Sequence, residues 1–114
     1  MKTAVQIDSE LQNAREVRYQ TWKAFEESPY NSINNPYQEK LYRLTAKVKK
    51  LEREYQIASA MESATFVLKQ TNERYGKKKA IDVFNNSFRK SIRFTKKRKE
   101  EIGLAAFGDK GALL

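Results

Sequence analysis

The chain has 114 residues, the size of one small domain, and its 23 Lys or Arg against 14 Asp or Glu give a net charge of +9. It contains no Cys and no His, which excludes a disulfide framework, Cys/His zinc or haem sites, and catalysis by a Cys or a Ser–His pair. No apolar run reaches the roughly 18 residues of a membrane span, and acidic residues follow the N-terminus too soon for a signal peptide. We therefore expect a soluble, intracellular protein.

A first helix is predicted over residues 4–27. Thr3 and Gln6 have the spacing of a capping box. Arg18 interrupts the apolar stripe of this helix, and it either extends its charged end to the helix edge or forms a buried ion pair with a Glu of the next helix. The apolar stripe of this first helix consists of Ala4, Ile7, Leu11, Ala14, Trp22 and Phe25.

Residues 28–36 are rich in Asn, Ser and Pro and indicate a loop.

A second helix is predicted over residues 36–75, because Pro36 suits a first helical position and Gly76 suits a helix end. Its first half carries an apolar seam with coiled-coil spacing over residues 37–58. From Ile57 onward a second stripe follows on another face. Either the helix breaks near Ser59, or one long helix presents two different faces to two neighbouring helices. We favour the single long helix. The seam over residues 37–58 is expected to be covered either by the first helix or by a second copy of the chain. Its members are Tyr37, Leu41, Leu44, Val48, Leu51, Tyr55 and Ala58.

A third helix is predicted over residues 78–102, ended by Gly103. Residues 104–114 then form a flexible or docking C-terminal tail. The sequence thus indicates an all-α fold with one domain over residues 1–103, in which a long central helix carries two shorter helices packed antiparallel on its two halves. The first packing is expected around Trp22, Phe25, Leu41 and Leu44, and the second around Met61, Leu68, Phe84 and Phe88.

The positive charge is concentrated between residues 74 and 99, which hold eleven Lys or Arg and a single acid, Asp82. A helix needs a polar outer face, and cations near its C-terminus offset the helix dipole. A merely solvated helix face is expected to mix positive and negative side chains, whereas the charges of this segment are almost all positive. A polyanion partner is therefore favoured. The candidate nucleic-acid-binding residues are Arg74, Lys77, Lys78, Lys79, Arg89, Lys90, Arg93, Lys96, Lys97, Arg98 and Lys99.

Sequence-specific recognition has less support. Phe94 lies off the inner stripe between Arg93 and Lys96, where it either stacks on a base or packs beneath the C-terminal residues. No phosphate-binding loop, dinucleotide fingerprint, HExxH motif or calcium loop is present. We therefore expect a non-enzymatic protein without cofactor or metal.

The partner is predicted to be DNA or RNA, bound mainly through phosphates with little sequence preference. The alternative is a helical adaptor, assembly subunit or inhibitor whose basic helix meets an acidic protein surface. A membrane surface is a less favoured partner, because Phe84 and Phe88 are needed in the core.

Overall fold

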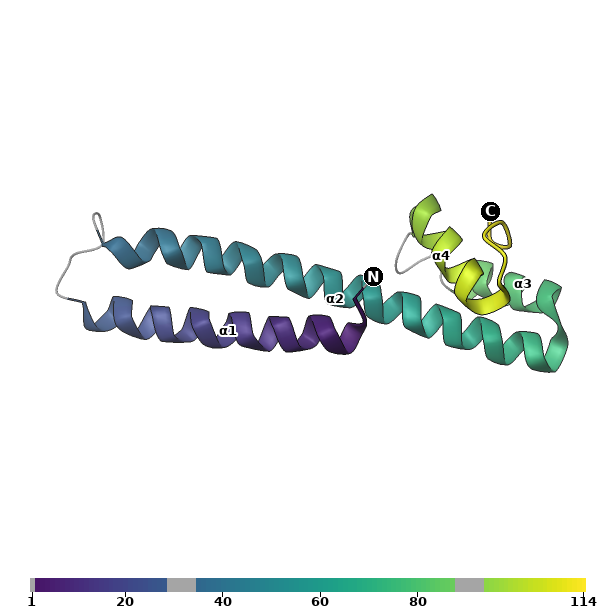
Figure 1. Cartoon of the computed structure of the whole chain (residues 1–114), viewed down its shortest axis with the longest axis horizontal. Coiled ribbons are helices and arrows are strands. Elements are labelled where there is room, and N and C mark those ends of the chain that lie inside the picture. Colours follow the sequence, from purple (N-terminus) through teal and green to yellow (C-terminus); the bar gives the residue numbers. More distant parts are fainter. Residues whose placement is uncertain (1, 29–34, 88–93) are drawn as a thin grey trace. The chain divides into compact units, whose positions relative to one another are not determined.

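The computed structural model describes residues 2–28, 35–87 and 94–114. Its described residues form four α-helices and no strand, which confirms the all-helical class (Figure 1). The chain divides into two compact units, residues 1–56 and 57–114, where a single domain over 1–103 was expected. The helices are α1 (Ala4–Glu27), α2 (Pro36–Tyr75), α3 (Lys77–Ser87) and α4 (Lys96–Phe107).

The first unit contains α1 and the first part of α2, which run side by side in opposite directions (Figure 1). The predicted capping box is confirmed: the Thr3 hydroxyl accepts from the Gln6 backbone N–H at 3.2 Å, and the Thr3 N–H donates to the Gln6 side chain at 2.9 Å. Both bonds satisfy backbone donors that a helix start leaves unpaired. The helix therefore begins where the sequence places it.

The buried side chains of this hairpin repeat at intervals of three and four residues, as in an antiparallel coiled coil. Trp22 was expected among them, yet it is exposed, and the neighbouring Thr21 is buried instead. The Thr21 hydroxyl donates to the Val17 carbonyl at 2.8 Å, which removes the cost of burying it. Phe25 is half-buried. The buried apolar residues of the unit are Ala4, Ile7, Leu11, Ala14, Val48 and Leu51.

Among the described residues of the hairpin, one ion pair joins the two helices, between the Arg15 guanidinium and the Glu52 carboxylate at 3.1 Å. The sequence suggested Arg18 for an interhelical pair, but Arg18 is half-buried and the cation that reaches the second helix is Arg15. Both partners are more than 40% exposed, so the pair adds little stability and mainly reports the register of the two helices.

Helix α2 begins at Pro36, where the Asn35 side chain accepts from the Tyr37 N–H at 2.9 Å. It continues through Ser59 without a break. It ends at Tyr75, because Gly76 adopts φ +92°, a conformation open to glycine at no steric cost.

The second unit contains the rest of α2 with α3, α4 and the C-terminal residues. Met61, Leu68 and Phe84, which the sequence placed together, share its core, while Phe88 lies outside the described residues. The buried members of this core are Met61, Ala64, Leu68, Ala80, Phe84, Phe94, Ile102 and Leu113.

The single helix expected over residues 78–102 is wrong, since α3 ends at Ser87 and α4 begins at Lys96. Phe84 and Phe94 both enter the core and their rings stack at 6.0 Å. Ten helical residues turn the chain by about 1,000°, roughly 80° short of three full turns, so one straight helix would direct the two rings to different sides. The chain instead starts a new helix at Lys96, and Thr95 caps it, because the Thr95 hydroxyl accepts from the Arg98 N–H at 3.3 Å.

Gly103 was expected to end that helix, yet it is buried inside α4. A Cβ at this position would lie 2.6 Å from the Asp109 carbonyl oxygen, so glycine permits the close approach of the chain that follows. Gly108, with φ +69°, ends α4 instead. Residues 104–107 thus belong to a helix, and Leu113 of the expected tail is buried in the core.

Candidate nucleic-acid interface

The described candidate cations form two groups in the second unit. The turn cluster, as we name it, lies where α2 ends and α3 begins, and all its side chains are exposed. The α4 cluster occupies the first turn of α4, with two exposed and two half-buried side chains. Arg89, Lys90 and Arg93 lie outside the described residues. The turn cluster is Arg74, Lys77, Lys78 and Lys79, and the α4 cluster is Lys96, Lys97, Arg98 and Lys99.

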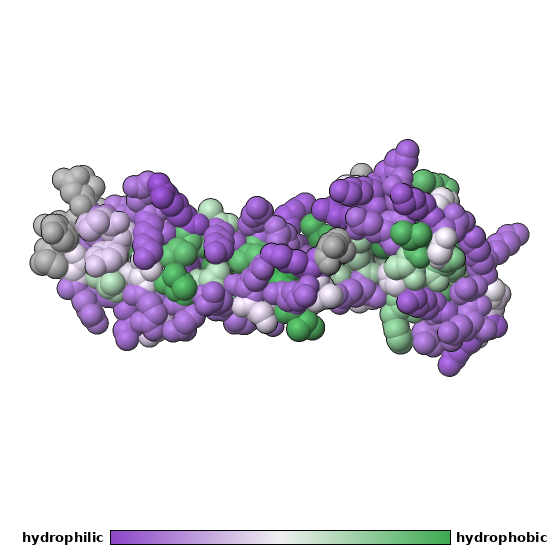
Figure 2. All heavy atoms as spheres, in the orientation of Figure 1, coloured by the Kyte–Doolittle hydropathy of each residue, from purple (hydrophilic) through white to green (hydrophobic). Residues whose placement is uncertain are grey.

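Charge is unequal between the two units. Residues 57–114 contain 13 Lys or Arg and six Asp or Glu, a net charge of +7, whereas residues 1–56 have a net charge of +2. Hydrophilic side chains cover much of the visible face around α3 and α4, with apolar atoms showing between them (Figure 2). The second unit therefore combines an apolar core with a strongly cationic surface.

Seven of these eight cations lie in the first turns of two helices. Gly76 supplies the carbonyl that accepts the Ala80 N–H at 3.1 Å, so α3 starts immediately after the glycine. Thr95 supplies the carbonyl that accepts the Lys99 N–H at 2.9 Å, so α4 starts immediately after the threonine. Neither first turn contains an acid.

This position is electrostatically unfavourable for cations. The N-terminus of a helix carries about half a positive charge, which stabilises Asp and Glu there and repels Lys and Arg. The explanation that these cations offset a helix dipole requires them at a C-terminus, and of the eight only Arg74 meets that requirement. Helix energetics therefore account for the position of one cation out of eight.

Lys77 is the one member of either cluster that forms an ion pair within the described part of the chain. Its ammonium donates to the Asp109 carboxylate at 2.9 Å and lies 5.6 Å from the centre of the Phe107 ring. The hydrogen bond from Lys77, followed by one from the Gly111 N–H and by the charge of Lys77, lowers the pKa of Asp109. Lys77 is thus partly occupied, whereas Lys78 and Lys79 are available to a ligand.

The two clusters lie at opposite ends of α4. Lys77 contacts Phe107 and Asp109, which mark the C-terminal end of α4. Lys97 lies ten residues before Phe107, a distance of about 15 Å along a helix. A ligand that contacts both clusters must therefore be extended, as a phosphate backbone is.

The suggestion that Phe94 stacks on a base is wrong. Phe94 is only 8% exposed and packs against Phe84 in the core of the second unit. Its ring is therefore closed to a ligand.

Asp109 and Phe107 are the residues that the sequence argument missed, because residues 104–114 were taken as a tail. Gly108, Asp109 and Gly111 form a turn in which the Asp109 side chain accepts from the Gly111 N–H at 2.9 Å. Glycine and aspartate at this spacing are typical of such turns. The turn could have been recognised from the sequence, whereas its contact with Lys77 could not.

No described helix is long and apolar enough to cross a membrane. Within residues 2–28, 35–87 and 94–114 no three acidic side chains come together in a group that could hold a metal ion. Comparison with known proteins found no matching family model, no matching curated protein and no matching solved structure.

Proposed function

We propose that residues 57–114 bind the phosphate backbone of a nucleic acid with little sequence preference. One observation carries the proposal: two helices of this unit begin with runs of cations and no acid, where the helix dipole opposes positive charge. The backbone N–H groups in the first turn of a helix favour anions as well. An anionic ligand would relieve the repulsion at both places.

The contacts follow from the two clusters. Lys78, Lys79, Lys96 and Lys97 are exposed and provide point charges for phosphates. Arg74 and Lys77, also exposed, complete the turn cluster, and the half-buried Arg98 and Lys99 complete the α4 cluster. Arg89, Lys90 and Arg93 remain candidates from the sequence.

Fluorescence anisotropy with labelled duplex DNA, single-stranded DNA and RNA at several salt concentrations tests the proposal. Two variants each remove two charges, Lys78→Gln with Lys79→Gln and Lys96→Gln with Lys97→Gln. We expect the affinity to fall with salt, and each variant to reduce the slope of log affinity against log salt by about 0.9 for every lost contact to duplex phosphate.

The matched control is Lys47→Gln with Lys50→Gln, which removes the same charge from exposed positions of the first unit. Equal losses in all three variants would mean that total charge governs binding and would contradict a local site. Absence of binding at low salt would refute the proposal. In that case, salt-sensitive binding to polyglutamate would favour the alternative partner, an acidic protein surface.

A further inference from the structure

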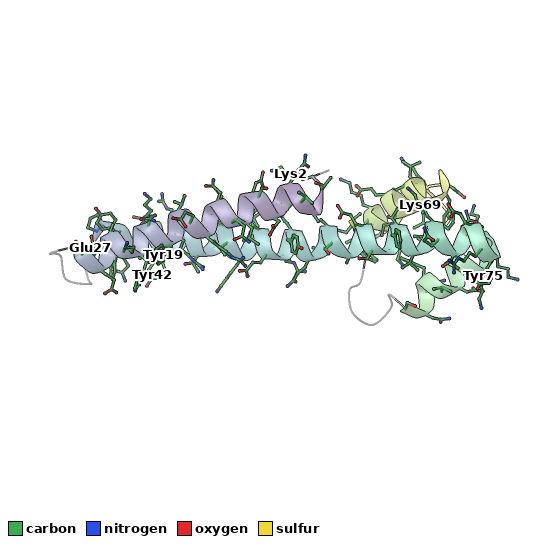
Figure 3. All side chains as sticks on the ribbon, turned by 90° about the horizontal axis from the view of Figure 1, so that it is seen from below. Lys2, Tyr19, Glu27, Tyr42, Lys69 and Tyr75 are labelled. Carbon is green, nitrogen blue, oxygen red and sulfur yellow. The ribbon has the colours of Figure 1, made fainter. Side chains whose placement is uncertain are left out.

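An exposed aromatic ring lies within the turn cluster. Tyr75 is the last residue of α2 and is 70% exposed, and in the sequence it stands between Arg74 and the run Lys77 to Lys79 (Figure 3). Leu68, seven residues earlier, lies on the same side of the helix and is fully buried. The core of the second unit therefore ends before the last turn of α2, and the ring of Tyr75 extends beyond it.

Exposure alone would not distinguish Tyr75, because single apolar side chains are common on protein surfaces. The other exposed aromatic among the described residues of the second unit is Phe66, at 63%. It lies nine residues before Tyr75, which is two and a half turns, so it is on the opposite side of α2. Glu62 and Lys69, both exposed, stand about one turn to either side of Phe66. Its surroundings thus have mixed charge, whereas those of Tyr75 are cationic.

The backbone around Tyr75 is held by two helices. The Gly76 N–H donates to the Asn72 carbonyl at 3.0 Å, and the Gly76 carbonyl accepts the Ala80 N–H at 3.1 Å, so this one residue joins α2 to α3. The Cα atoms of Tyr75 and Lys78 are consequently no more than about 11 Å apart. A Cβ on Gly76 would meet no described atom within 4 Å, which leaves the surface there open. The ring and the cations therefore occupy one small region on a rigid support.

The acids nearest to this region lie outside it. Glu73 precedes Tyr75 by two residues, a rotation of about 200°, and so belongs to the opposite side of α2. Asp109 accepts from Lys77 at 2.9 Å, and Asp82 lies in a later turn of α3. The end of α2 and the first turn of α3 thus present positive charge beside the ring.

We infer that Tyr75 stacks on an unpaired base of a single-stranded nucleic acid while Lys78 and Lys79 contact the neighbouring phosphates. This inference rests on the phosphate binding proposed for the same unit. Proteins that bind single strands combine cations along the backbone with aromatic rings on which bases stack, whereas the bases of a duplex are stacked on each other. The ring therefore adds affinity for single strands and none for duplexes. Every base has a face that can stack, so low sequence preference is retained.

Four labelled probes of about twelve nucleotides separate stacking from charge. They are single-stranded deoxyuridine DNA, the corresponding uridine RNA, a DNA strand of equal length and charge that lacks bases, and a DNA duplex. Fluorescence anisotropy of the full chain at several salt concentrations gives each affinity. We expect the strands with bases to bind about tenfold more tightly than the strand without bases, which is the contribution of one stacked base.

Tyr75→Leu removes the ring and keeps an apolar side chain that favours a helix. We expect it to weaken binding to the strands with bases about tenfold, and to leave the strand without bases, the duplex and the salt slope unchanged. Tyr75→Phe keeps the ring and should stay within about twofold of the native protein. Phe66→Leu is the matched control and should change none of these affinities. Circular dichroism checks that each variant is folded.

Equal affinity of the native protein for strands with and without bases would overturn this inference. So would unchanged binding by Tyr75→Leu, or equal losses in Tyr75→Leu and Phe66→Leu. In each of these cases, a reduced salt slope in Lys78→Gln with Lys79→Gln would still support the phosphate site. Absence of binding to every probe at low salt would overturn both proposals. Where Tyr75→Leu has the expected effect, tighter binding of the uridine strand would assign RNA as the ligand, and tighter binding of the deoxyuridine strand would assign DNA.

Discussion

Removing two cations from the start of α4 should make the protein more stable while it weakens binding to polyanions. Lys96 and Lys97 are the first two residues of α4, exposed, with no acid in that turn. A charge at this position contributes about 0.3–1 kcal/mol at low ionic strength, unfavourably for a cation. Lys and Gln have similar helix propensities, so Lys96→Gln with Lys97→Gln should raise the free energy of unfolding by about 1 kcal/mol.

Urea denaturation followed by far-UV circular dichroism measures this change as a shift in midpoint. With a slope of about 2 kcal/mol per M urea, the midpoint should rise by roughly 0.5 M. The gain should shrink as salt is added, because the charges are exposed and screened. The control, Lys47→Gln with Lys50→Gln, removes equal charge from the middle of α2 and should stay within about 0.5 kcal/mol of the native protein.

A lower midpoint in the Lys96→Gln, Lys97→Gln variant would refute the reasoning, since it would give these lysines a structural role. An unchanged midpoint at low salt would also contradict it. A higher midpoint combined with weaker binding to nucleic acid is the pattern of a functional site that costs stability.

Three further changes test the second unit. Gly103→Ala should cost about 1–3 kcal/mol in urea denaturation, since its Cβ meets the Asp109 carbonyl oxygen, whereas Gly111→Ala should be nearly neutral; equal effects would contradict the close approach. Leu68→Ala should cost about 2–5 kcal/mol in the same assay. Lys77 lowers the pKa of Asp109, so their contact stabilises the fold at pH values above the ordinary carboxyl pKa. This stabilisation is lost as the pH falls through the lowered pKa of Asp109. The melting temperature of Asp109→Asn should therefore fall less on acidification than that of the native protein.

The local signals in the sequence were sufficient to predict several helix ends. The Thr3–Gln6 capping box, the start at Pro36 and the stop at Gly76 all appear in the structure. These features depend on a few adjacent residues and on backbone chemistry, which any fold must respect. The concentration of cations between residues 74 and 99 is likewise a property of the sequence alone.

Tertiary packing decided which side chains are buried and which distant residues they contact. Periodicity could not distinguish Thr21 from Trp22 as the buried residue, because neighbouring positions on a helix differ by only 100° and the partner helix selects between them. Phe94 and Gly103 acquire their roles from residues distant in sequence, Phe84 and Asp109, which meet them only after the chain folds. The sequence by itself determined the all-helical class, the best-marked helix ends and the distribution of charge. Local periodicity carries no information about which distant side chains will fill the core. Tertiary contacts alone therefore divided residues 78–102 into two helices, and this division placed Lys96 to Lys99 at a helix N-terminus.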